Sequence, residues 1–215
     1  ASVVHAVGVR LEDDGALDIA APFGLDDLFG LVPHLPEHVT VAAVRAPLPL
    51  QPGSHAWFPL SQDPVTGELG STAEPVREAV KALHAWVQAV RGDFRTVSLL
   101  GFSQGMAMAT TVLRLRPEAF TCGVGLSGFA VDNELLAMLD SPAEGPGPRP
   151  FFWGRDVEDP VIHPDAVAHT RAWAEEHTRL TVRTYPGILH GTGPDEVRDV
   201  RIFLEHSLRA ATPGS

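Results

Sequence analysis

The chain has 215 residues, of which 44% are hydrophobic and 20% charged, a composition typical of an ordinary soluble globular protein. Its length suits one domain over residues 1–215 with a sizeable core. Because 27 acidic residues stand against 16 basic ones, the net charge of -11 argues against nucleic acid and anionic membrane surfaces as partners.

Strand-like and helix-like segments alternate along the chain, which predicts a mainly parallel sheet with helices on both faces. The expected strands are 3–9, 16–20, 39–44, 96–100, 122–126, a strand entered through 150–154, and 180–185. The expected helices are 26–35, 71–91, 106–116, 133–139, 164–177 and 196–208. The loop 46–70 is rich in Pro and Gly and holds Trp57 and Phe58. Loops this long usually line sites or are disordered, and exposed aromatic residues favour the first interpretation.

The cysteine count and the distribution of apolar residues bear on the cellular compartment of the protein. A single cysteine, Cys122, cannot form an internal disulfide, and we interpret it as a small buried strand residue rather than a nucleophile. No basic segment followed by an apolar stretch opens the chain, and no apolar run approaches the ~20 residues of a membrane span. We therefore expect a cytoplasmic protein without a membrane span.

The segment Gly101-Phe102-Ser103-Gln104-Gly105 stands between an apolar strand and a helix. A G-x-S-x-G at such a turn is the nucleophile elbow of α/β-hydrolases. The sharp reversal forces the serine into a strained backbone region and requires glycine two residues to either side. It also sets Ser103 at a helix N-terminus, where unpaired N–H groups favour developing negative charge. The pattern predicts a nucleophilic serine, and a helix-capping serine in a Gly-rich turn is the alternative.

A serine hydroxyl needs a base, and the base needs an orienting acid, in the chain order Ser, Asp or Glu, His. His190 lies on a Gly/Pro-rich loop between the last strand and the last helix, so we predict it as the base. The other downstream histidines lie in, at the ends of, or just before predicted helices: His163, His169, His177 and His206.

For the acid, the loop after residues 151–154 offers Asp156, Glu158 and Asp159. Asp159 directly precedes Pro160, so a short loop can present it near the strand end. We favour Asp159 over its competitor Asp156, although both residues also suit a turn-forming role.

Three segments together carry a resemblance: 101–105, then Gly154 through 159–162, then 185–187 through 190–191. They resemble the carboxylesterase/phospholipase family of α/β-hydrolases, which includes bacterial small carboxylesterases and acyl-protein thioesterases. The likeness runs from about Leu17 to Leu208. It implies the α/β-hydrolase fold, with Ser103 as nucleophile, Asp159 as acid and His190 as base. A small-molecule ester is the implied partner of a monomer or homodimer.

The resemblance also implies a substrate pocket. Residues 45–49, followed by Trp57 and Phe58, resemble the family loop that lines the acyl pocket, so Leu48, Trp57 and Phe58 are predicted pocket residues. A loop that packs on the body of the protein would use the same residues, and this is the alternative. Met106 stands where the family commonly has glycine. It either narrows this pocket or packs under the sheet.

The oxyanion hole departs from the family pattern. One donor is the N–H of Gln104, directly after the nucleophile. The second comes from an early loop, where Ala21-Pro22 stands in place of His-Gly and Phe23 keeps the donor position. Pro22 has no N–H, so a shift of one residue would leave a single donor.

The sequence therefore predicts a serine carboxylesterase that hydrolyses short-chain esters through an acyl-enzyme. An acyl thioesterase or acyltransferase with the same triad is the alternative within enzymes. A hydrolase-fold binding protein with an impaired oxyanion hole is the alternative outside them. No H-E-x-x-H, cysteine cluster or phosphate loop appears, so we expect no metal and no cofactor.

Overall fold

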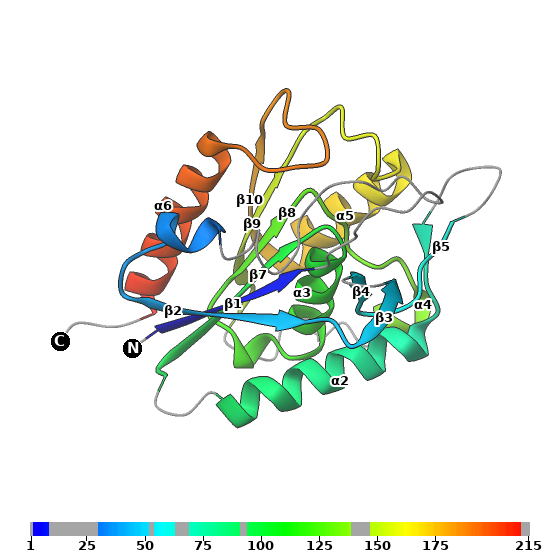
Figure 1. The fold of residues 1–215 in the computed structure, drawn as a ribbon, viewed down its shortest axis with the longest axis horizontal. Helices are drawn as coiled ribbons and strands as arrows, with labels where there is room; N and C mark the ends of the chain where they lie inside the picture. The colour runs from blue at the N-terminus through cyan, green and yellow to red at the C-terminus, as the bar shows by residue number, and fades with distance from the viewer. Residues whose placement is uncertain are drawn as a thin grey trace.

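The centre of the molecule is a parallel six-stranded sheet (Figure 1). The structure, a computed structural model, describes residues 2–8, 30–51, 54–62, 69–90, 94–138 and 147–211. In spatial order the strands are β10 (Thr178–Thr184), β9 (Arg149–Arg155), β8 (Gly123–Leu126), β7 (Thr96–Phe102), β1 (Ser2–Gly8) and β2 (Val39–Arg45). Every neighbouring pair runs parallel, as the alternation of segments predicts.

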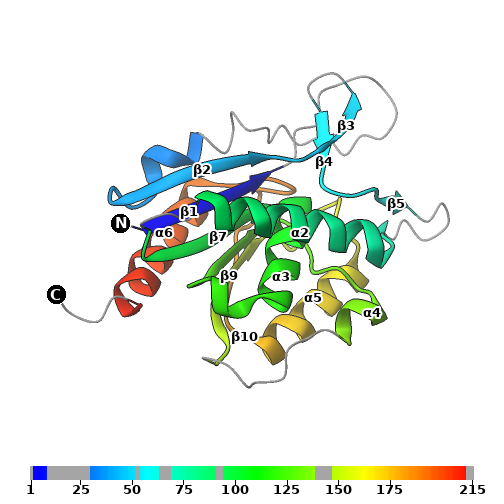
Figure 2. The same ribbon diagram turned by 90° about the horizontal axis from the view of Figure 1, so that it is seen from below.

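Helices cover both faces of this sheet (Figure 2). The longer helices are α2 (Ala73–Val90), α3 (Gln104–Leu115), α5 (Pro164–His177) and α6 (Pro194–Ala210). Successive side chains of a strand point to opposite faces, so one strand contributes side chains to the cores on both faces of the sheet. On β9, Trp153 belongs to the core under α2, α3 and α5, whereas Phe152 belongs to the core under α6. The prediction of helices on both faces is confirmed.

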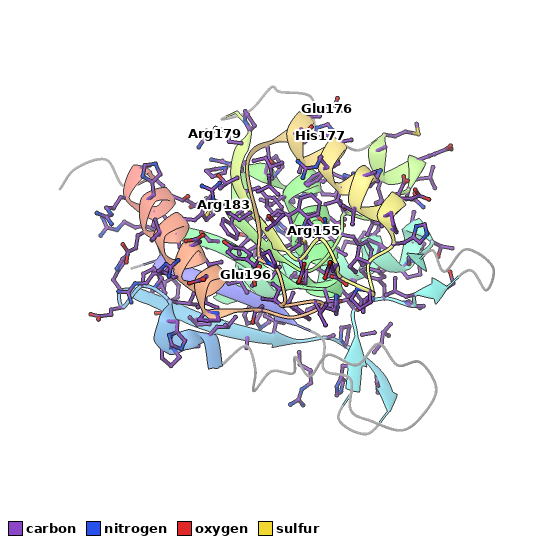
Figure 3. All side chains as sticks on the ribbon, turned by 90° about the horizontal axis from the view of Figure 1, so that it is seen from above. Arg155, Glu176, His177, Arg179, Arg183 and Glu196 are labelled. Carbon is purple, nitrogen blue, oxygen red and sulfur yellow. The ribbon has the colours of Figure 1, made fainter. Side chains whose placement is uncertain are left out.

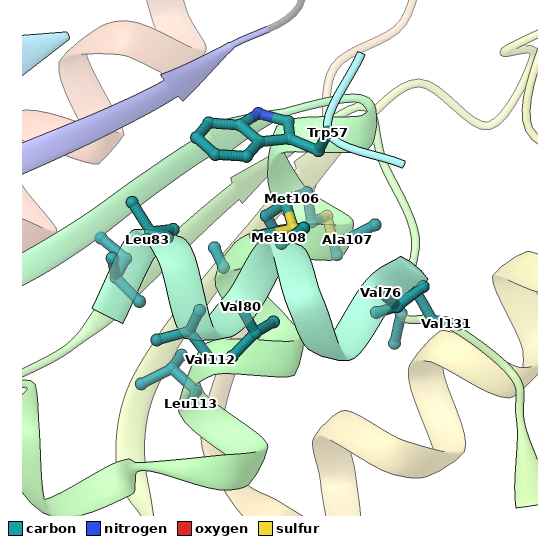
Figure 4. Packing of buried hydrophobic residues seen from close by; sticks show 14 of the residues in the cluster. Trp57, Val76, Val80, Leu83, Met106, Ala107, Met108, Val112, Leu113 and Val131 are labelled. Carbon is teal, nitrogen blue, oxygen red and sulfur yellow. The ribbon is translucent and has the colours of Figure 1, made fainter. Parts of the chain in front are cut away.

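The first core is built from the apolar stripe of α2 against α3. Val76, Val80 and Leu83 follow the three-and-four spacing of a buried helix face and are at most 3% exposed. They pack with residues of α3 such as Val112 (Figure 4). This packing fixes α3 against the sheet, and α3 starts directly after Ser103.

The loop 46–70 contains structure that the sequence did not indicate. It forms two short antiparallel pairs, β3 (Leu48–Gln51) with β4 (Ser54–Ala56), and β5 (Ser61–Gln62) with β6 (Leu69–Gly70). The expectation that Trp57 and Phe58 are exposed is wrong, since only 3% and 0% of their surfaces are accessible. Apolar rings gain more from packing in the core beside α2 and α3 than from solvent contact.

The remaining expected elements differ from the structure mainly at their ends. Within 26–35, the described part is helical at residues 30–31 and continues as the 3-10 helix η1 (Val32–His34). A second 3-10 turn, η2 (Pro117–Ala119), follows α3, and α4 (Glu134–Ala137) is capped by the side chain of Asn133. The expected strand 16–20 lies outside the described residues. Among the described helices, none has the length and apolarity needed to cross a bilayer.

Candidate active site

Ser103 sits in a strained turn between β7 and α3. Its backbone angles are φ 52° and ψ -120°, outside the regions that L-residues normally occupy. A Cβ at Gly101 would overlap the backbone of Gly105, so this approach requires glycine. The geometry is that of the predicted nucleophile elbow, and it holds the serine side chain at the carboxyl end of β7.

The structure brings Ser103, His190 and Asp159 together in one chain of hydrogen bonds. Ser103 Oγ lies 3.1 Å from His190 Nε2, and His190 Nδ1 lies 2.9 Å and 3.1 Å from the two Asp159 oxygens. A carboxylate only accepts, so Nδ1 carries the proton and donates to Asp159. Nε2 is then free to accept the Ser103 hydroxyl proton. The side chains of His190 and Asp159 are 5% and 1% exposed, which keeps water from competing for these bonds.

Asp156, the alternative acid, makes different contacts. One of its carboxylate oxygens accepts the N–H groups of Gly187 at 2.7 Å and Leu189 at 2.9 Å. The other accepts the N–H of Glu158 at 3.0 Å. These N–H groups, Glu158 and Leu189 foremost, lower the pKa of Asp156. The fully buried carboxylate therefore holds the backbone of the loop that carries His190.

A third contact to that loop comes from Ser127, at the carboxyl end of β8. Its hydroxyl donates to the Gly191 carbonyl at 2.8 Å, and its N–H donates to the Gly154 carbonyl at 2.9 Å. Ser127 has φ 41°, and Leu189, directly before His190, has φ 51°. With Ser103 these are the non-glycine residues of positive φ in the described part of the chain, so the backbone strain gathers around His190.

Sequence reasoning missed the positioning roles of Ser127 and Asp156. Their positions in the sequence could have indicated these roles. Each residue directly follows the end of a central strand, and the sites of α/β sheets form at these strand ends. Phe102 also supports the base, with its ring centroid 5.2 Å from that of the His190 imidazole.

The other downstream histidines have local contacts of their own. His163 caps α5 and accepts the N–H of Asp165 at 3.3 Å. His169 Nδ1 lies 3.4 Å from an oxygen of Asp132. His177 ends α5 and lies against Trp173.

Of the two predicted oxyanion donors, Gln104 lies within the described residues and Phe23 does not. Gln104 is the first residue of α3, a position whose N–H has no acceptor within the helix. That N–H is therefore available to a bound oxyanion. Phe23, with Pro22 before it, lies outside the described residues. Both assignments stay predictions.

Most of the predicted pocket residues are buried in this structure. Phe58 and Met106 are 0% exposed and Trp57 is 3% exposed, while Leu48 on β3 is 38% exposed. Met106 packs so closely on Gly125 and Gly128 that a Cβ at either glycine would overlap it. This is the packing alternative weighed for Met106. Assignment of these four residues to an acyl pocket stays a prediction.

A hollow of about 430 Å³ lies beside the start of α6 and extends from Leu31 and His34 to Thr192. Its two arginines already have acidic partners, since Arg198 pairs with Asp195 at 2.7 Å and Arg201 with Glu205 at 3.1 Å. We assign it no part in the chemistry of Ser103.

Cys122 is buried, and burial raises the pKa of its thiol to about 11. The thiol donates to Ser98 Oγ at 3.2 Å, in line with a packing role next to β8. Across the described ranges, no group of three or more His, Cys, Asp or Glu side chains is arranged to hold a metal ion.

Comparison with known proteins gives the relationships of the chain. A family model described as phospholipase/carboxylesterase matches residues 33–208. The chain is 21% identical over 164 residues to a probable carboxylesterase SOBER1-like of Arabidopsis thaliana, covering 74% of this chain and 62% of that protein. It is 29% identical over 164 residues to acyl-protein thioesterase 1 of Candida albicans, covering 70% of this chain and 68% of that one. The chain thus spans less than two thirds of the first of these relatives.

The fold has counterparts among solved structures. The crystal structure of acyl-protein thioesterase 2 of Zea mays superposes with a TM-score of 0.74 at 18% identity, covering 97% of this chain and 94% of that one. Such a likeness confirms the α/β-hydrolase fold. Together with the family match over residues 33–208, it shows that this chain belongs to the phospholipase/carboxylesterase family of α/β-hydrolases.

Proposed function

We propose that the chain is a serine esterase, a single α/β-hydrolase domain that cleaves short-chain carboxylic esters. The proposal rests on the continuous hydrogen bonding from Ser103 through His190 to Asp159 at a strained strand-to-helix turn. Family membership supports it, because the relatives carry the names carboxylesterase and acyl-protein thioesterase.

In the first half-reaction, Ser103 Oγ attacks the ester carbonyl while His190 Nε2 takes the hydroxyl proton. Asp159 orients the imidazole and stabilises its charged form without taking the proton itself. The negative charge on the carbonyl oxygen is met by the Gln104 N–H and by a second donor, for which Phe23 is our candidate. His190 then donates its proton to the departing alcohol, which leaves the acyl group on Ser103.

In the second half-reaction, water enters and His190 accepts its proton. The hydroxide attacks the acyl carbonyl, and the second tetrahedral intermediate collapses to release the carboxylic acid. Ser103 recovers its proton from His190. Each step uses the same two contacts of the imidazole, so the cycle returns to the starting arrangement.

The test is hydrolysis of p-nitrophenyl acetate and butyrate by the protein and by Ser103→Ala. Without the nucleophile we expect turnover to fall by about 10³-fold or more, since what remains comes from binding and the oxyanion hole alone. Ser61→Ala, on exposed β5, is the matched control and should keep full activity. Full activity in a folded Ser103→Ala protein would refute the proposal.

The second candidate is an acyl thioesterase with the same triad, favoured by the relatives named acyl-protein thioesterase. A thioester and an oxoester with the same acyl group separate the two. A higher kcat/KM on the oxoester supports the esterase, and a higher value on the thioester supports the alternative.

A further inference from the structure

The side chain of Gln104 makes two buried hydrogen bonds to a distant segment of the chain. Its Oε1 accepts the backbone N–H of Trp57 at 2.9 Å. Its Nε2 donates to the backbone carbonyl of Phe58 at 2.8 Å. Gln104 is 4% exposed, so both bonds form away from water and use the two ends of one amide.

The Trp57–Phe58 segment is also held by core packing and by a neighbouring hydrogen bond. It joins two short strand pairs, β3–β4 and β5–β6, that are separate from the six-stranded sheet. The rings of Trp57 and Phe58 pack in the core with α2 and α3, and Figure 4 shows Trp57 above Met106 and Met108. Directly after Phe58, the Pro59 carbonyl accepts the Ser71 hydroxyl at 2.9 Å. The two hydrogen bonds of the Gln104 amide join this segment to the residue next to the nucleophile.

The position of Gln104 gives these bonds a consequence for the site. Its Cα is about 3.8 Å from that of Ser103, as in any trans peptide. The segment bonded to its side chain is therefore joined to the residue next to the nucleophile. This segment directly follows β4, where Ala56 pairs with Leu48, a predicted pocket residue that is 38% exposed. The indole N–H of Trp57 is buried and has no acceptor among the residues that the structure describes. A shift of the segment would move Ala56 and its partner Leu48, whose exposed side chain is our candidate for contact with the acyl chain.

We propose that the Gln104 side chain is a positioning residue that fixes the Trp57–Phe58 segment against the nucleophile and so sets the selectivity for acyl chain length. This inference rests on the proposed esterase function. It is separate from the predicted oxyanion role of Gln104, which uses only the backbone N–H. Side-chain variants keep that N–H and therefore separate the two roles.

The experiment compares Gln104→Met with the unmodified protein. Met has a similar volume but makes neither amide bond. The first measurement is the ratio of kcat/KM for p-nitrophenyl hexanoate to that for p-nitrophenyl acetate. We expect this ratio to fall about tenfold, mainly through KM for hexanoate, the factor expected from losing one or two buried hydrogen bonds. A merely structural role would lower both values equally and leave the ratio unchanged.

The second measurement is hydrogen exchange of residues 55–60, which needs no substrate. We expect faster exchange in Gln104→Met, with protection of β9 unchanged. Gln88→Met, the same change at an exposed position of α2, should match the unmodified protein in both measurements. Gln104→Leu serves as a second variant if Gln104→Met fails to fold, because it also makes neither amide bond and should change both measurements in the same direction.

Unchanged exchange at residues 55–60 together with an unchanged ester ratio would overturn the inference. Faster exchange with an unchanged ratio would remove the selectivity role. An unmodified protein that hydrolyses neither ester would count against the proposed function itself. The exchange of residues 55–60 would still decide whether Gln104 holds the segment.

Discussion

At the scale of single residues, two aspartates on one loop have different tasks. Asp159 faces His190 Nδ1, and its Oδ1 also accepts the N–H of Val161 at 2.8 Å. Asp156 instead accepts three backbone N–H groups, one from its own loop and two from the loop that carries His190. Asp159 thus orients the His190 imidazole, and Asp156 orients the backbone of the loop that carries His190.

This division predicts a ranking of variants in ester hydrolysis. Asp159→Asn removes the charge that stabilises the imidazolium, and we expect kcat to fall by about 10³ to 10⁴. Asp156→Asn places an NH₂ group against backbone donors, shifts His190, and should cost about tenfold with faster exchange at residues 187–191. The exposed Asp195→Asn is the control. The reverse ranking would make Asp156 the acid.

The sequence could predict some of these residues and not others. Ser103 follows from a motif whose glycines are required by geometry, and His190 from its place between the last strand and helix. Residue type alone could not separate Asp159 from Asp156, because both suit turns. The positive φ values of Ser127 and Leu189 could not be predicted from the sequence, because L-residues rarely adopt such angles and neither position is glycine.

At the scale of elements, α6 packs on β9 through a buried carboxyl group. Glu196 lies in the first turn of α6 (Figure 3) and is 0% exposed. Its carboxyl group packs so closely on Gly154 that a Cβ there would overlap it. Neither carboxyl oxygen makes a well-formed hydrogen bond within the described part. Burial raises the pKa of Glu196 to about 8, and the nearby Gly193 N–H offsets only part of this.

A raised pKa in the folded state makes stability depend on pH. Between pH 4.5 and about 8 the unfolded chain ionises Glu196 while the folded one keeps its proton, so stability falls as pH rises. Across this range we expect a loss on the order of 5 kcal/mol, at about 1.4 kcal/mol per pKa unit. Above pH 8 both states are ionised and the slope ends.

Glu196→Gln removes this slope because the amide does not titrate. The measurement is the free energy of unfolding by urea at several pH values from 5 to 9. Glu175→Gln, with a side chain 58% exposed, is the matched control and should keep the slope of the unmodified protein. An equal slope in Glu196→Gln would contradict the assignment.

The elements themselves were predictable to different degrees. Helices with clear caps and apolar stripes, such as α5 at Pro164–His177, match their expected bounds. The strand pairs within 46–70 were missed because strands of two to four residues are too short to show a period.

At the scale of the whole molecule, the order of the strands assembles the site. Strands β7, β8, β9 and β10 are neighbours in the sheet and point the same way, so their following loops meet at one edge (Figure 1). Ser103 and His190 are 87 positions apart in the chain and come within hydrogen-bond distance there. Alternating segments indicate a parallel sheet, but strand order depends on long-range packing that local patterns do not encode.

The most direct test of the central claim is covalent labelling with a fluorophosphonate, which reacts with an activated serine hydroxyl. We predict that the folded protein takes up one label, that peptide mass spectrometry places it on Ser103, and that Ser103→Ala takes up none. An unlabelled folded protein, or labelling that persists in Ser103→Ala, would contradict the account.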